Sequence, residues 1–211
     1  MFEVRTDLAV EENERITKAQ EETKGISVTE EDYGEEQIHI TTVRITTENG
    51  AKQMGKPKGT YITLEAAEMI EDDEDYHREI SQALAHHLKE LLHLEKEKSI
   101  LVVGLGNREI TPDALGPQVI QNLKITRHII KEYGKAGMGK EKVHQISSLV
   151  PGVMAQTGME TMEIIRGVIR ETDPDAVIAI DALAARSVRR LNCTIQITDT
   201  GINPGSGVCN H

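Results

Sequence analysis

Two aspartates, Asp113 and Asp181, each stand just beyond a short apolar run, where a carboxylate can do chemistry. Asp181 directly follows the run 176–180, and Asp113 follows the run 100–103 after a Gly-rich stretch. Both runs are typical of strands buried on both faces of a parallel sheet. Because parallel strands present their carboxyl ends at one edge, we expect both side chains to face a shared crevice.

Such a pair of carboxylates suits hydrolysis of an amide bond. Both cannot ionise easily at close range, so one can act as the base that activates water and the other as the acid that protonates the leaving amine. The same two acids could instead hold a divalent metal that acidifies a bound water. A purely structural role also stays open: Asp113 could stabilise a helix amino terminus, and Asp181 could bond backbone at a strand end.

The stretch that carries Asp113 reads as strand, Gly-rich loop and helix. Gly104 and Gly106 allow a sharp turn after the strand, and Asn107 belongs to the same loop. Thr111 is expected to cap the next helix, with Pro112 at its first position and Asp113 in its first turn. A dinucleotide-binding fingerprint would need a third glycine where Glu109 stands, so nucleotide binding is not expected.

The remaining pattern predicts a mixed α/β protein. Helices are expected over 11–24, 74–95 and 159–171, the last with Thr157 as its cap and Glu160 in a capping box, and good helix formers follow at 182–186. Strands are expected over 38–47, with a bulge at 41–42, and over 61–64 and 194–198; Asn49-Gly50 signals a turn, and 133–142 reads as a surface loop. We therefore expect a three-layer α/β/α fold with a largely parallel central sheet. Residues 1–98 form a β-rich, acidic addition with one long amphipathic helix to the core 99–211, within the same domain.

Composition limits the functional classes. The formal net charge is −11 and aromatic residues make up only 2% of the chain, which argues against direct nucleic-acid binding. Two cysteines form no zinc pattern or disulfide framework, no stretch is long enough to span a bilayer, and no signal peptide is visible, so a reducing cytoplasm is expected. His86, His87 and His93 lack the four-residue spacing of a helical zinc motif and are expected at the surface or its boundary; no metal or cofactor is predicted.

Several blocks closely resemble the spore germination protease family of endospore-forming bacteria. They are residues 5–9, 61–65, 104–107, 111–117, 151–154, 179–186, 198–201 and 204–208. The resemblance implies a cytoplasmic endopeptidase of the spore core that begins the degradation of small acid-soluble spore proteins. It implies that the protein is made as a zymogen and assembles as a homotetramer. It also implies an atypical aspartic peptidase, whose two catalytic acids match Asp113 and Asp181.

The resemblance also leaves two alternatives to an active aspartic peptidase open. The loop and helix at 104–117 are similar to hydrogenase maturation endopeptidases, α/β/α proteins in which the acid at the position of Asp113 contacts a metal. A metal-assisted hydrolase therefore stays open. The family continues beyond the block 204–208 and carries a propeptide before the block 5–9, so this chain is expected to be a shortened form. A catalytically silent binding or assembly module is the third alternative.

Overall fold

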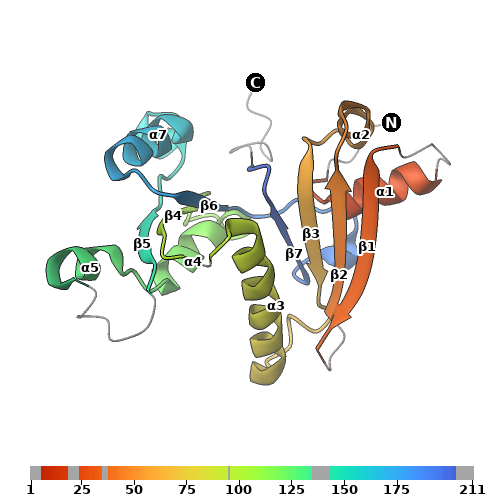
Figure 1. The fold of residues 1–211 in the computed structure, drawn as a ribbon, viewed down its shortest axis with the longest axis horizontal. Helices are drawn as coiled ribbons and strands as arrows, with labels where there is room; N and C mark the ends of the chain where they lie inside the picture. Colours follow the sequence, from red (N-terminus) through yellow and green to blue (C-terminus); the bar gives the residue numbers. More distant parts are fainter. Residues whose placement is uncertain (1–5, 19–23, 35–37, 95, 135–142, 203–211) are drawn as a thin grey trace. The chain divides into compact units, whose positions relative to one another are not determined.

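The structure is a computed structural model that describes residues 6–18, 24–34, 38–94, 96–134 and 143–202. It divides into two compact units, the first comprising residues 1–92 and 183–201 and the second residues 93–182 and 202–211. One unit contains an antiparallel sheet and the other a parallel sheet, so the predicted mixed α/β class is confirmed (Figure 1).

The first unit is built on a four-stranded antiparallel sheet. Its strands are β1 (Ile26–Tyr33), β2 (Ile38–Ile45), β3 (Gly59–Glu65) and β7 (Thr194–Thr198), in that spatial order. The strands expected over 38–47 and 61–64 thus pair in a sheet of their own. The predicted bulge at 41–42 is wrong, because the β2–β3 register runs without interruption from His39 opposite Glu65 to Ile45 opposite Gly59.

Helices cover both faces of this sheet. On one face, Ile16 of α1 (Ala9–Lys18) and Met54 of α2 (Glu48–Met54) pack in a cluster with residues of β2 and β3. On the other face, the apolar stripe of α3 (Glu74–Leu92) packs against β2 and β3. The turn predicted at Asn49-Gly50 is wrong: both residues lie in α2, because the hydroxyl of Thr47 accepts a hydrogen bond from the amide of Gly50 at 3.1 Å and caps the helix.

The second unit is built on a three-stranded parallel sheet. Strand β4 (Ser99–Gly104) lies between β5 (Gln145–Leu149) and β6 (Ala176–Ile180). Residues of β4 and the following Leu105 pack on α7 (Thr161–Thr172), while α4 (Leu115–Asn122) lies against β4. Strand β4 is buried as predicted. Burial of both faces is wrong for β6, because this strand is at the sheet edge and Val177 is 40% exposed.

Short elements complete the second unit. Helix α5 (Arg127–Tyr133) lies near β5, and α6 (Met154–Thr157) precedes α7. The predicted cap of α7 is wrong, because Glu160 occupies the N-cap and forms a capping box with Glu163. The loop predicted at 133–142 lies largely outside the described residues. None of the helices in the described ranges is long and apolar enough to cross a membrane.

Candidate active site

The carboxyl ends of β4 and β6 meet at one edge of the parallel sheet. Gly104 lies opposite Ile180 in the register, and the amide of Leu105 donates a hydrogen bond of 2.8 Å to the carbonyl of Ile180. The chain that follows each strand carries one of the two predicted acids. The structure therefore places Asp113 in the loop that follows β4 and Asp181 directly after the neighbouring strand.

Asp113 is held above this edge by a compact turn. The 3₁₀ turn Thr111–Asp113 has Pro112 near its start, and the amide of Asp113 bonds the carbonyl of Ile110 at 2.8 Å. The half-buried side chain of Asp113 accepts a hydrogen bond of 2.8 Å from the amide of Asn107 through Oδ2. The predicted helix therefore starts as a 3₁₀ turn, with no side-chain cap from the exposed Thr111.

The glycines of the loop serve different purposes. Gly106 has φ of 106°, and a Cβ there would overlap the backbone carbonyl of Asp113. A Cβ on Gly104 would instead overlap the backbone of Gly116 in α4. Gly116, which the sequence analysis did not single out, is itself packed against Leu105 and the carbonyl of Ile180. Small residues thus bring the start of α4 close to the ends of both strands.

Asp181 is also half-buried, and its Oδ1 accepts a hydrogen bond of 2.9 Å from the amide of Ala182. The helix expected after it, over 182–186, is absent. Backbone groups of this segment bond elsewhere: Ala184 exchanges hydrogen bonds with Asp7, and the amide of Arg186 bonds Glu11. An extended conformation is favoured because these partners satisfy the backbone without a helix.

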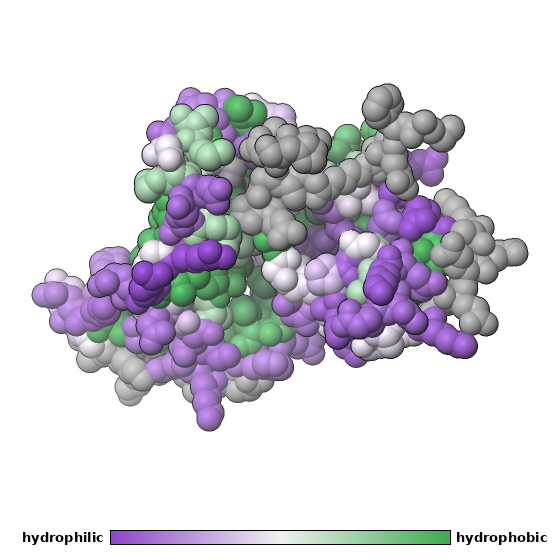
Figure 2. Space-filling model, turned by 90° about the horizontal axis from the view of Figure 1, so that it is seen from above, coloured by the Kyte–Doolittle hydropathy of each residue, from purple (hydrophilic) through white to green (hydrophobic). Residues whose placement is uncertain are grey.

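The surroundings of Asp113 contain one polar contact that sequence spacing does not signal. Gln156 of α6 donates a hydrogen bond of 3.2 Å to the side chain of Asn107, whose Oδ1 also accepts one from the amide of Glu109. Ile110 and Leu115 flank Asp113 and are about half exposed, as is Met154 of α6. Hydrophobic residues also gather on one face of the second unit, in the left half of Figure 2. Apolar side chains exposed near an acid can contact a peptide substrate.

The described residues include one group of at least three His, Cys, Asp or Glu side chains whose ligand atoms lie within metal-binding reach of one another. It consists of His86, His87 and Glu90 on α3, in the first unit. Among the described residues, neither Asp113 nor Asp181 belongs to a group of this kind. The expectation that all three histidines lie at the surface or its boundary is wrong for His87, which is 5% exposed.

Sequence comparisons place the chain among known proteins. Residues 3–211 match the family model described as Germination protease. The chain is 50% identical over 207 residues to a Germination protease of Caldanaerobacter subterraneus subsp. tengcongensis, covering 98% of this chain and 62% of the relative. It is 48% identical over 214 residues to that of Bacillus subtilis, covering 98% and 57%, and 45% identical over 212 residues to that of Clostridium perfringens, covering 100% and 64%.

The chain thus spans about three fifths of the length of these relatives. The match nevertheless runs through both units, from the segment before α1 to the residues that follow β7. It includes the Gly-rich loop with Asp113 and the strand end with Asp181. The chain belongs to the germination protease family.

Proposed function

We propose that the chain carries the catalytic acids of an endopeptidase that begins the degradation of small acid-soluble spore proteins during germination. One observation carries the proposal: Asp113 and Asp181 follow the carboxyl ends of two neighbouring parallel strands, β4 and β6. Family membership supports the peptidase activity and its place in germination. Self-association, as a tetramer, is part of the same proposal, and the protein acts in the spore core.

In the proposed reaction, the two carboxylates divide the work of general acid and base. The ionised aspartate takes a proton from a water molecule as its oxygen attacks the carbonyl carbon of the scissile peptide bond. The protonated aspartate donates its proton to the leaving nitrogen as the C–N bond breaks. The products are one new carboxyl and one new amino terminus, and the pair has exchanged its single proton.

The loop contributes by positioning. The hydrogen bond from the amide of Asn107 fixes the side chain of Asp113, and Gly106 allows the loop to approach that residue closely. A reacting group is most effective when its geometry is set before the substrate binds. Ile110 and Leu115 are exposed on either side of Asp113 in the chain and are proposed to contact the substrate peptide.

The test is to replace each acid singly. Asp113→Asn and Asp181→Asn keep the size of the side chain but cannot exchange the proton, so each should lower the rate of cleavage of a small acid-soluble spore protein by about 10²–10⁴-fold. The double variant should be little worse than either single variant, because the acids act as a unit. Cleavage is measured by electrophoresis and mass spectrometry.

Asp173→Asn is the matched control. Asp173 is exposed and precedes the amino end of β6, whereas Asp181 follows the carboxyl end of that strand. Its left-handed φ of 43° is tolerated by asparagine. This variant should cleave like the unsubstituted chain. Full activity in either acid variant would remove that residue from the mechanism. Tight substrate binding without cleavage by the unsubstituted chain would contradict the proposal and favour a silent binding module.

A further inference from the structure

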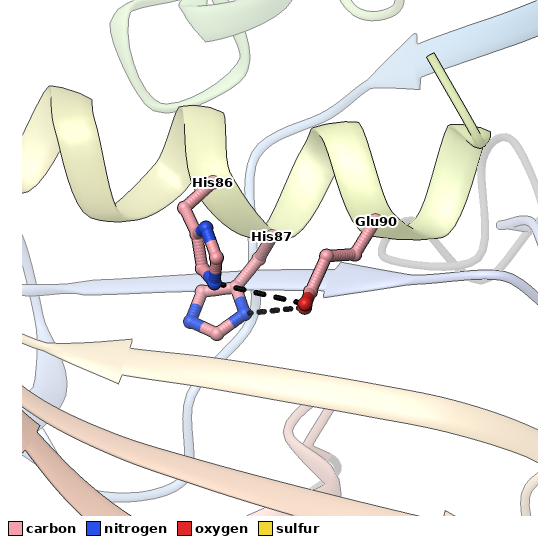
Figure 3. Close-up of side chains that lie close together, drawn as sticks. All are labelled: His86, His87 and Glu90. Atoms are coloured by element: carbon pink, nitrogen blue, oxygen red, sulfur yellow. Dashed lines mark ion pairs between the residues drawn. The ribbon is translucent and has the colours of Figure 1, made fainter. Parts of the chain in front are cut away.

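Three potential metal ligands project from one stretch of α3. The Nε2 of His86 lies 3.7 Å from Oε1 of Glu90, and the Nδ1 of His87 lies 3.7 Å from Oε2 of the same residue (Figure 3). One ligand atom from each of the three residues lies within 4.8 Å of the others. Residues three and four positions apart are neighbours on a helix, so Glu90 faces both histidines.

His87 is the buried member of this group. Its side chain is 7% exposed, and it follows Ala83 on the face of α3 that packs on the sheet. The Nδ1 atom is buried, and within the described part of the chain it has no hydrogen-bond partner. A buried polar atom without a partner is unfavourable, so a native structure normally supplies one. Nδ1 points toward Glu90 in Figure 3, where a bound cation would supply that partner.

The separations fit a shared metal ion better than direct hydrogen bonds. A nitrogen and an oxygen 3.7 Å apart are beyond hydrogen-bond distance. Two ligands on one tetrahedral Zn²⁺ with bonds of about 2.0–2.1 Å lie roughly 3.3 Å apart. Small side-chain rotations of His86 and Glu90 close this difference, since their side chains are 58% and 62% exposed.

We propose that His86, His87 and Glu90 bind a divalent first-row transition metal ion, with Zn²⁺ as the best match to two imidazoles and one carboxylate. The exposed side of the group leaves the remaining position to water. Each histidine would bind the ion through an unprotonated ring nitrogen, and Glu90 through a carboxylate oxygen. The site belongs to the first unit and is independent of the proposed function of Asp113 and Asp181, which lie in the second.

The test uses the whole 211-residue chain after treatment with a chelator and buffer exchange. Co²⁺ is titrated while its visible ligand-field absorption is followed, and Zn²⁺ binding is measured by calorimetry and by displacement of Co²⁺. One ion per chain is expected. His86→Ala and Glu90→Gln should each weaken the affinity for the metal at least about tenfold. Substituting a residue that only hydrogen-bonds a metal ligand already has an effect of that size, and here the ligand itself is removed.

Both substituted side chains are exposed, so the variants are expected to fold, and circular dichroism checks this. Two control variants should bind the ion like the unsubstituted chain. One is His128→Ala, which removes an exposed histidine on α5. The other is Asp113→Asn, which changes one of the two proposed catalytic acids. The inference is overturned if no saturable binding occurs, if affinity is unchanged in His86→Ala and Glu90→Gln, or if Asp113→Asn abolishes binding.

Discussion

Gly106 and Asp113 are coupled at the scale of single residues, because the backbone of one occupies the space that a side chain on the other would need. Gly106 combines a φ of 106° with contact to the carbonyl of Asp113. The pairing explains why a glycine follows Leu105 in the loop. It also means that the position of Asp113 depends on a residue that bears no functional group.

Gly106→Ala should therefore lower the free energy of unfolding by about 3 kcal/mol, through both backbone strain and overlap with Asp113. Gly158→Ala is the matched control: its φ is 70°, but a Cβ there meets nothing within 4 Å. It should cost only ~1 kcal/mol for the left-handed conformation. Urea unfolding followed by circular dichroism measures both. Equal losses in the two variants would show that the overlap is relieved at no cost.

The sequence predicts that the two aspartates follow neighbouring strands, but not the contacts that hold them in place. The apolar runs predict the two strands, so that Asp181 directly follows one strand and Asp113 lies in the loop after the other, and the parallel sheet brings the carboxyl ends of both strands together. The side chain of Gln156 bonds Asn107 from 49 positions away, and Gly116 packs against Leu105 and Ile180, whereas the amide of Asn107 bonds Asp113 within one loop. No local pattern encodes such contacts, so they could be found only from the folded structure.

At the scale of elements, acidic side chains of α1 join this helix to the segment 184–190. Glu11 is 4% exposed, and its carboxylate accepts hydrogen bonds from the amides of Arg186 and Ser187 at 2.8 and 2.9 Å. Burial by itself would raise the pKa of Glu11. Hydrogen bonds from Thr6, from the two amides and from Arg190 outweigh this effect, and they hold the pKa below its ordinary value.

This lowered pKa fixes the sign of a pH effect. The unfolded chain binds a proton at Glu11 more readily than the folded chain, so the contribution of Glu11 to stability is present above about pH 4.5 and is lost as the pH falls through the folded-state pKa. Glu11→Gln should cost about 1–3 kcal/mol at pH 7, and the difference from the unsubstituted chain should shrink in acid.

Thermal unfolding at several pH values measures this difference. Glu68→Gln, a change at an exposed acid, serves as the control and should follow the unsubstituted chain at every pH. A gap between Glu11→Gln and the unsubstituted chain that stays constant down to pH 3 would contradict the ionic role of Glu11.

The elements that sequence reasoning missed share a physical cause. Strand β1 is largely exposed and rich in acids, so it lacks the apolar signal of a strand and is specified by pairing with β2. The helix expected over 182–186 has suitable residues, but Asp7 and Glu11 satisfy its backbone in an extended form. Tertiary partners overrode local propensity in both cases. Strand β4 and helix α3 were predictable because their side-chain patterns reflect their packing; the apolar run of β6 predicted a strand but not its exposed face.

At the scale of the whole molecule, net charge opposes association while a sheet edge favours it. The formal net charge of the chain is −11 at pH 7. Within the described residues, β6 pairs on one side only, and Val177 on it is exposed. An edge strand with apolar side chains is a template for pairing with a second chain.

Added salt should therefore promote self-association, because it screens the repulsion without weakening the strand edge. We expect the mean mass measured by light scattering to rise between low salt and 0.5 M NaCl, a concentration that shortens the Debye length to roughly 4 Å. Val177→Lys should suppress the rise, and Val188→Lys, at an exposed residue outside both sheets, should not. An equal response of the two variants would exclude β6 as the contact.

The hydrogen bonds between Asp7 and Ala184 also have a consequence for biosynthesis. They join residues 177 positions apart, and the fourth strand of the antiparallel sheet pairs Tyr61 with Thr198. The first unit therefore cannot be completed until residues near 198 have left the ribosome, although its first residues emerge earliest. The parallel sheet needs only residues 99–180 and can form sooner. During translation the middle of the chain would thus fold before its beginning.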